Sequence, residues 1–214
     1  MGASTRTKMM ATRKRSLEIL VMMVVSLFGV LCDKALSHPH VFIVQRIEIV
    51  FDDKGLAGFG VAWTFDEMFS SMIVGDYDKN QNRSLEPDEI KAIKKGAFSY
   101  LSNYHYFTFV KIDGQPFEVK FVTDFWAEVK EKKLIYRFFV PCHVAARSSH
   151  RHIVAANYDP SYYTAIFYAE DRPAALKNAG AFDVGTAIRQ DESTSIYYGM
   201  VNPWALFLDF RKKQ

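Results

Sequence analysis

Apolar residues alternate with polar ones in short runs along most of this chain, a pattern typical of β-strands with one buried face. The clearest run extends from Val41 to Val50, and a turn at residues 52–55 (DDKG) separates it from a second run that ends near Trp63. Similar runs return after Asn103. A longer stretch of helical periodicity interrupts them at residues 64–102, so the sequence predicts an α+β fold, a mostly antiparallel β-sheet domain with an inserted EF-hand-like helical hairpin.

The helical interruption is expected at residues 64–102. Thr64 and Glu67 have the spacing of a capping box, and the apolar residues around them recur at helical spacing. Pro87 suits the first turn of a second helix, which has an apolar stripe of its own. The insert is therefore predicted to be a helix–loop–helix.

The last part of the chain has a less regular pattern. Residues 153–157 and 163–168 are predicted to form an antiparallel pair of strands across the turn at Asp159 and Pro160. Residues 172–178 are predicted to form a short helix. Further strands are expected at residues 187–190, 196–200 and 205–210.

The first 37 residues have the organisation of a secretory signal peptide. Basic residues at 13–15 precede an apolar run of 13 residues from Ile19 to Leu31, and Ala35 and Ser37 put small residues at the −3 and −1 positions of a cleavage site. Such a run is shorter than the roughly 18 to 20 residues that cross a bilayer as a helix. We therefore expect a single periplasmic domain, residues 38–214, with no membrane span after cleavage.

Charge and cysteine content restrict the partners of this domain. The chain has 27 basic and 24 acidic residues, and the first 37 positions hold six and two of them, which leaves 21 against 22. A domain with this balance lacks the basic surface of a nucleic-acid binder, so nucleic acid is excluded as a partner. Cys142 is the one cysteine after residue 37, so stability must come from packing or bound metal rather than from a disulfide.

Residues 78–89 read DKNQNRSLEPDE and match the calcium loop of an EF-hand. Calcium takes about six to eight oxygen ligands, which such a loop supplies from alternate side chains, one carbonyl and a final glutamate on the departing helix. The expected ligands are the side chains of Asp78, Asn80, Asn82 and Glu89, the carbonyl of Ser84, and Glu86 acting through a water.

Arg83 departs from this pattern, because the sixth loop position normally holds glycine at positive φ. A non-glycine residue there costs about 1 kcal/mol or more. Since only three of the expected ligands are carboxylates, we expect weak calcium binding, with a dissociation constant of about 10⁻⁴ to 10⁻³ M. The alternative is a polar loop that joins two helices without a metal.

Two His-x-His pairs are candidate ligands for a transition metal. His38 with His40, and His150 with His152, each place two imidazoles on one face of an extended strand. Imidazole suits nickel, cobalt or zinc better than calcium, so the histidines and the calcium loop are expected to bind different ions. The alternative is that these are unrelated polar positions. Further candidate ligands are Cys142, His143 and Asp124, with Cys142 alternatively a small buried hydrophobe.

The sequence carries no arrangement typical of an enzyme. No serine lies in a nucleophile elbow, no glycine-rich phosphate loop is present, and Cys142 and His143 are neighbours whose side chains point apart on a strand. An N-terminal histidine that binds copper through its amine and ring is the one catalytic alternative. We expect a protein that is not an enzyme.

Three segments together resemble one bacterial family. They are HPHVFI at residues 38–43, directly after the signal peptide, WTFDE at 63–67, and NYDPSYY at 157–163. With them the mature chain resembles the family known as domain of unknown function 1007, described as the periplasmic component of an uncharacterised ABC-type transport system. Members tend to be encoded beside nickel/cobalt permeases, so the resemblance implies a periplasmic role in divalent-metal transport.

These observations lead to two functional hypotheses. The first is a periplasmic divalent-metal-handling protein that presents nickel, cobalt or zinc to a membrane permease or ABC-type transporter, while calcium stabilises the insert. The second is a calcium-stabilised protein-interaction module with no transition-metal role, whose aromatic contact surface is centred on Tyr162, Tyr163 and Trp204.

Overall fold

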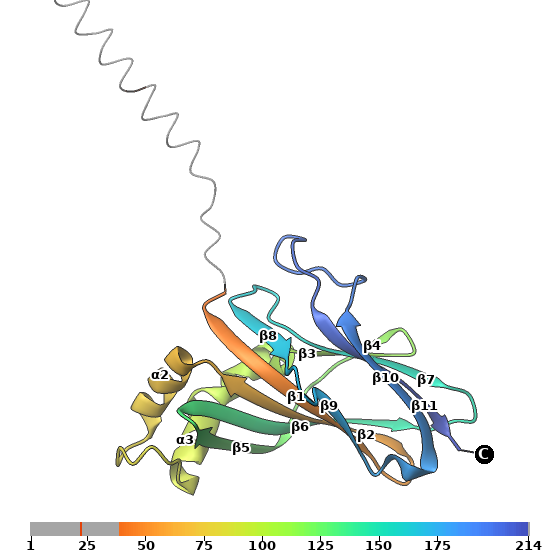
Figure 1. Ribbon diagram of the computed structural model, residues 1–214, viewed down its shortest axis with the longest axis horizontal. Helices are drawn as coiled ribbons and strands as arrows, with labels where there is room; N and C mark the ends of the chain where they lie inside the picture. Colours follow the sequence, from red (N-terminus) through yellow and green to blue (C-terminus); the bar gives the residue numbers. More distant parts are fainter. Residues whose placement is uncertain (1–21, 23–38, 214) are drawn as a thin grey trace, which may run out of the picture. The chain divides into compact units, whose positions relative to one another are not determined.

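The computed structural model describes residue 22 and residues 39–213, and the latter lie in one compact unit (Figure 1). Apart from residue 22, the expected signal peptide lies outside the described residues. Within them, no helix is both long enough and apolar enough to cross a membrane.

A six-stranded sheet forms the larger half of the fold. The predicted hairpin is present as β1 (Val41–Phe51) and β2 (Gly55–Phe65), which pair antiparallel. On the far side of β2 lies β6 (Lys133–Ala145), and beyond it β5 (Thr123–Lys130), both antiparallel to their neighbours. Alternate residues of β1 are buried, as the sequence pattern predicts for a strand with one face in the core.

The free edge of β1 binds two short strands in parallel. β8 (Thr164–Tyr168) pairs with the first half of β1, and β9 (Ala174–Lys177) pairs with the second half. The prediction of a helix at 172–178 is therefore wrong. Residues 174–177 instead bond to the backbone groups that β1 would otherwise leave unpaired, and this tertiary pairing overrides their local helical propensity.

A second sheet of five strands packs against part of the first. Residues 153–157 lie in its central strand, whereas residues 164–168 lie in the six-stranded sheet, so their predicted antiparallel pairing is wrong. Within the predicted strand 196–200, only Ile196 makes a β-bridge, to Val201. The strands, in spatial order, are β10 (Phe182–Gln190), β11 (Trp204–Lys212), β7 (Arg151–Asn157), β3 (Thr108–Ile112) and β4 (Gln115–Phe117).

Two layers share the inner face of the six-stranded sheet. Near one end, Phe51 stacks on Phe182 of the five-stranded sheet at 5.0 Å between ring centroids. Near the other end the inner face is aromatic, with Trp63 and Phe138 at 4.9 Å, and a helical insert covers it. Figure 1 shows this insert beside β5 and β6. It consists of α2 (Glu67–Tyr77), α3 (Pro87–Gly96) and a 3₁₀ segment (Phe98–Phe107).

The helical hairpin begins slightly later than predicted. Asp66, not Thr64, caps α2, because its carboxylate accepts the N–H of Phe69 at 2.9 Å. Thr64 and Phe65 remain in β2, where Phe65 packs edge-on against Tyr136 of β6 at 4.9 Å. Burying that ring keeps the strand extended for two residues beyond the expected start of the helix.

Ser70 joins the hairpin to the sheet and provides a test of this packing. Its fully buried hydroxyl donates to the carbonyl of Asp66 at 2.6 Å and accepts the N–H of Leu134 in β6 at 2.9 Å. Ser70→Ala leaves that buried N–H unsatisfied, so the free energy of unfolding should fall by about 1–3 kcal/mol. Urea unfolding measures the loss, and Ser71→Ala, at an exposed neighbouring position, should stay within about 0.5 kcal/mol of wild type.

Candidate functional site

The 78–89 loop joins the two helices and closes on itself through its own polar side chains. Asp78 ends α2 and is only 6% exposed, and Glu89 lies in the first turn of α3 and is 5% exposed. Charged side chains are rarely so buried without partners. Both carboxylates are therefore held by the loop backbone, and they approach it from opposite ends.

Asp78 organises the first half of the loop. Its carboxylate accepts the N–H of Arg83 at 2.7 Å and the N–H of Asn82 at 3.2 Å. Asn80 also accepts the N–H of Asn82, at 3.0 Å, and the side chain of Asn82 accepts the N–H of Ser84 at 2.7 Å. The side-chain oxygens of loop positions 1, 3 and 5 are thus all turned onto the loop backbone.

Glu89 links the two ends of the loop. One of its oxygens accepts the N–H of Lys79 at 2.8 Å, and the other accepts the N–H of Glu86 at 3.0 Å. Glu86 in turn is the N-cap of α3 and forms a reciprocal capping box with Glu89. The two glutamates at loop positions 9 and 12 therefore begin α3 and close the loop at the same time.

Glu86 carries an unsatisfied acceptor. Its Oε1 accepts a hydrogen bond from the side-chain amide of Asn82 at 2.6 Å, whereas its Oε2 is buried and has no hydrogen-bond partner among the described residues. The neighbouring side chains of Glu89, Asn82 and Asn80 lower the pKa of Glu86 to about 2. The carboxylate stays ionised at neutral pH, with one oxygen available to a further donor or cation.

Arg83 has a positive φ of 63°, as the sixth position of an EF-hand loop would need. This is the left-handed region, which glycine enters freely and other residues enter at a cost. The cost does not prevent the turn here, because the N–H of Arg83 is held by Asp78.

Replacing Arg83 measures the cost of this conformation. Arg83→Gly and Arg83→Ala both remove the same side-chain charge, but only glycine relieves the positive φ. We expect Arg83→Gly to be about 1 kcal/mol more stable to urea than Arg83→Ala, with both measured in chelator. Equal stabilities for the two variants would contradict a left-handed residue at this position.

His40 and the pair formed by His150 and His152 lie in different parts of the fold. His40 precedes β1, and its ring lies 5.0 Å from that of Tyr163, while its predicted partner His38 lies outside the described residues. His150 and His152 lie at the start of β7, and the end of β7 leads into the 158–163 turn beside His40. Among the described residues, His40 is thus separated from His150 and His152 along the length of β7.

His152 has a partner that sequence reasoning missed. It stands opposite Asp209 of β11, and its Nδ1 contacts the carboxylate oxygen of that residue. Both side chains are exposed, by 67% and 52%. The residues are 57 positions apart, so only the pairing of β7 with β11 brings them together.

The remaining candidate ligands are dispersed. Burial raises the pKa of the Cys142 thiol to about 12, so it behaves as a small core residue rather than a thiolate. His143 and Asp124 are exposed on different strands. Within residues 39–213, no three His, Cys, Asp or Glu side chains are arranged to hold a metal ion. The expected calcium ligands include two amides and a carbonyl, which lie outside those four residue types.

Two of the three aromatic residues named in the second hypothesis, Tyr162 and Trp204, lie near each other. The carboxylate of Asp159 accepts the N–H groups of Ser161 and Thr164 and so shapes the turn that carries Tyr162 and Tyr163. Tyr162 lies 5.5 Å from Tyr197, between ring centroids. Tyr162 and Trp204 also line one small cavity of about 120 Å³.

Comparison with known proteins assigns the family. Residues 23–196 match the family described as "Protein of unknown function (DUF1007)". The chain belongs to this family. It is 31% identical over 136 residues to an uncharacterised 15.5 kDa protein of Spirochaeta aurantia, a match that covers 64% of this chain and 96% of the relative. It is 30% identical over 145 residues to an uncharacterised protein of Haemophilus influenzae, a match that covers 66% of each chain.

Proposed function

We propose that this DUF1007 protein is a periplasmic, non-enzymatic protein that handles divalent metal ions, and that its 78–89 loop binds calcium. The observation that carries the calcium proposal is the convergence of Asp78 and Glu89 on the loop backbone from its two ends. The left-handed backbone at Arg83 and the unsatisfied oxygen of Glu86 add support.

The donor set suits a hard cation. Carboxylate and amide oxygens are the ligands that calcium prefers, and the loop brings no sulfur or imidazole. Each of these oxygens has a second lone pair, so the hydrogen bonds that shape the loop leave acceptor capacity for an ion. Asp78, Asn80, Asn82 and Glu89 would bind calcium directly, the Ser84 carbonyl would add a ligand, and Glu86 would act through a water.

Calcium should therefore stabilise the wild-type protein. With a dissociation constant of about 10⁻³ to 10⁻⁴ M, about 10 mM calcium raises the free energy of unfolding by about 1.4–2.7 kcal/mol. We expect this gain to disappear in Asp78→Asn and in Glu89→Gln. Urea unfolding in calcium and in chelator measures the gain for each variant. A substitution that destabilises the fold lowers the free energy of unfolding in both conditions, whereas loss of calcium binding removes the difference between the two.

The matched control for this experiment is Asp88→Asn. Asp88 lies at loop position 11, is exposed, and is not an expected ligand, yet its substitution removes the same charge. It should keep most of the calcium gain. A gain that survives in both Asp78→Asn and Glu89→Gln would refute the calcium loop.

A transition-metal role rests on the histidines. The contact between His152 and Asp209 offers an imidazole and a carboxylate on one exposed face, and His150 lies two residues before His152. Cleavage after Ser37 would place His38 at the mature N-terminus, so its amine and ring would lie close to His40 in sequence. Nickel, cobalt or zinc held in this way would be presented to a membrane permease or ABC-type transporter.

Metal titrations distinguish the two pairs. Nickel, cobalt or zinc should raise the melting temperature of the mature protein, and His38→Ala with His40→Ala should abolish the rise if the N-terminal pair binds. If the second pair binds, His152→Ala and Asp209→Asn should abolish it instead. His143→Ala is the control. A protein that responds to calcium alone would favour the interaction module with its surface near Tyr162, Tyr163 and Trp204.

A further inference from the structure

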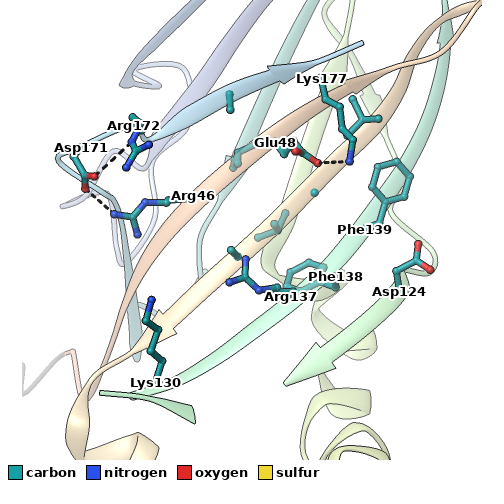
Figure 2. A pocket seen from close by; sticks show the side chains of 16 residues that line it. Arg46, Glu48, Asp124, Lys130, Arg137, Phe138, Phe139, Asp171, Arg172 and Lys177 are labelled. Atoms are coloured by element: carbon teal, nitrogen blue, oxygen red, sulfur yellow. Dashed lines mark hydrogen bonds and ion pairs between the residues drawn. The ribbon is translucent and has the colours of Figure 1, made fainter. Parts of the chain in front are cut away.

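The outer face of the six-stranded sheet carries a groove that the calcium loop and the histidines do not use. It has a volume of about 880 Å³ and is lined by residues of β1, β2, β5, β6 and β9 (Figure 2). Within residues 39–213, both covering layers pack on the inner face, and no helix or second sheet covers the outer one. Its charged lining residues are Arg46, Glu48, Asp124, Lys130, Arg137, Asp171, Arg172 and Lys177.

Small residues of β2 form the floor of this groove. The strand register aligns Arg46 of β1, Ala62 of β2 and Arg137 of β6 in one row. The next row places Gly60 beside Glu48, and a Cβ added to Gly60 would lie 3.4 Å from the Cβ of Glu48. The depth of the groove therefore comes from two small residues between longer side chains.

The basic side chains of the groove retain unused hydrogen-bond donors. Arg46 donates to Asp171 at 2.6 Å, and two nitrogens of Arg137 share one oxygen of Glu128, at 2.9 and 3.2 Å. A guanidinium group has five N–H donors, so each arginine keeps donors for a ligand. Both arginines are about half exposed, at 46% and 54%.

The groove has a small excess of positive charge. Its lining has five basic residues and three acidic ones, and Glu128, which pairs with Arg137, brings the acidic side chains to four, whereas residues 38–214 as a whole have 21 basic and 22 acidic residues. Among the described residues, Lys130 has no carboxylate partner. Figure 2 shows Arg46 and Arg137 over the groove, with Lys130 toward one end and the Lys177–Glu48 pair toward the other.

The segment between β8 and β9 builds one wall. The chain leaves the edge of β1 after Tyr168 and returns to it at Ala174, and the intervening residues carry Asp171 and Arg172 toward Arg46. Asp171 thereby orients the Arg46 guanidinium, and that contact lowers the pKa of Asp171 below its usual range. The arginine is held in place before any ligand arrives.

We propose that this groove binds a small organic anion with two or more carboxylates. Strands lie about 4.8 Å apart, so the Cα atoms of Arg46 and Arg137, on either side of β2, are separated by about 9–10 Å. Two separated guanidinium groups match two carboxylates on one molecule better than a single compact anion, because each can bind one carboxylate in a bidentate manner. Exposed Trp126, which pairs with Arg137 in the same row, offers a flat surface beside the site.

Glutarate tests the proposal, with acetate as the single-carboxylate control at equal ionic strength. Isothermal titration calorimetry on the exported domain should show saturable glutarate binding and none for acetate over the same range. Arg46→Gln and Arg137→Gln should each weaken binding at least about tenfold, since each removes a charge-assisted bidentate contact. Arg137→Lys keeps the charge but loses the planar guanidinium group that donates two parallel hydrogen bonds, so it should also weaken binding several-fold.

Arg189→Gln is the matched control, because Arg189 lies over the ring of Phe207 in the other sheet and outside the groove. Binding should be unchanged in this variant. Circular dichroism melting confirms that each variant is folded. The proposal is overturned if glutarate shows no saturable binding, if acetate binds equally well, or if Arg46→Gln and Arg137→Gln behave like Arg189→Gln.

Discussion

The inner face of the six-stranded sheet is the constraint on which the rest of the structure depends. It carries a continuous set of large apolar side chains, from Phe51 at one end to Phe65 at the other, and all of them must leave water. The five-stranded sheet covers one part, and the helical hairpin covers the other. The hairpin is therefore part of the layer that covers the core. A change in the loop that loosens the hairpin should lower the stability of the whole domain.

The same constraint leaves the outer face of that sheet open. With both covering layers on one side, alternate residues of β1 and β6 point to solvent, and the strand period places Arg46 and Arg137 there in register. An antiparallel sheet with one solvated face is ordinary. Here, small residues on the central strand β2 and arginines on both sides of it form a groove. The segment between β8 and β9 extends this groove by bringing Asp171 to Arg46.

Local patterns predicted those parts of the structure that local interactions determine. The β1–β2 hairpin follows from alternation and a turn sequence, and the left-handed conformation of Arg83 follows from its place in the loop. Parallel pairing of β9 with β1 could not be read in this way, because the two segments are more than 100 positions apart and the partner decides the structure. The contact of His152 with Asp209 has the same origin, since it exists only where β7 and β11 align.

Within the loop, the candidate calcium ligands also hold the two helices. Asp78 ends α2, while Glu86 and Glu89 cap α3, so the helix ends place three carboxylates in one short loop. Backbone N–H groups offset part of their mutual repulsion, and one oxygen of Glu86 has no hydrogen-bond partner among the described residues. A bound cation would offset the remaining repulsion. Because the turn and the hydrogen bonds of the loop are already formed, the ion would act chiefly by neutralising the charge of the loop carboxylates. The stability gained in the loop would be passed to the core by the hairpin, which covers Trp63 and Phe65.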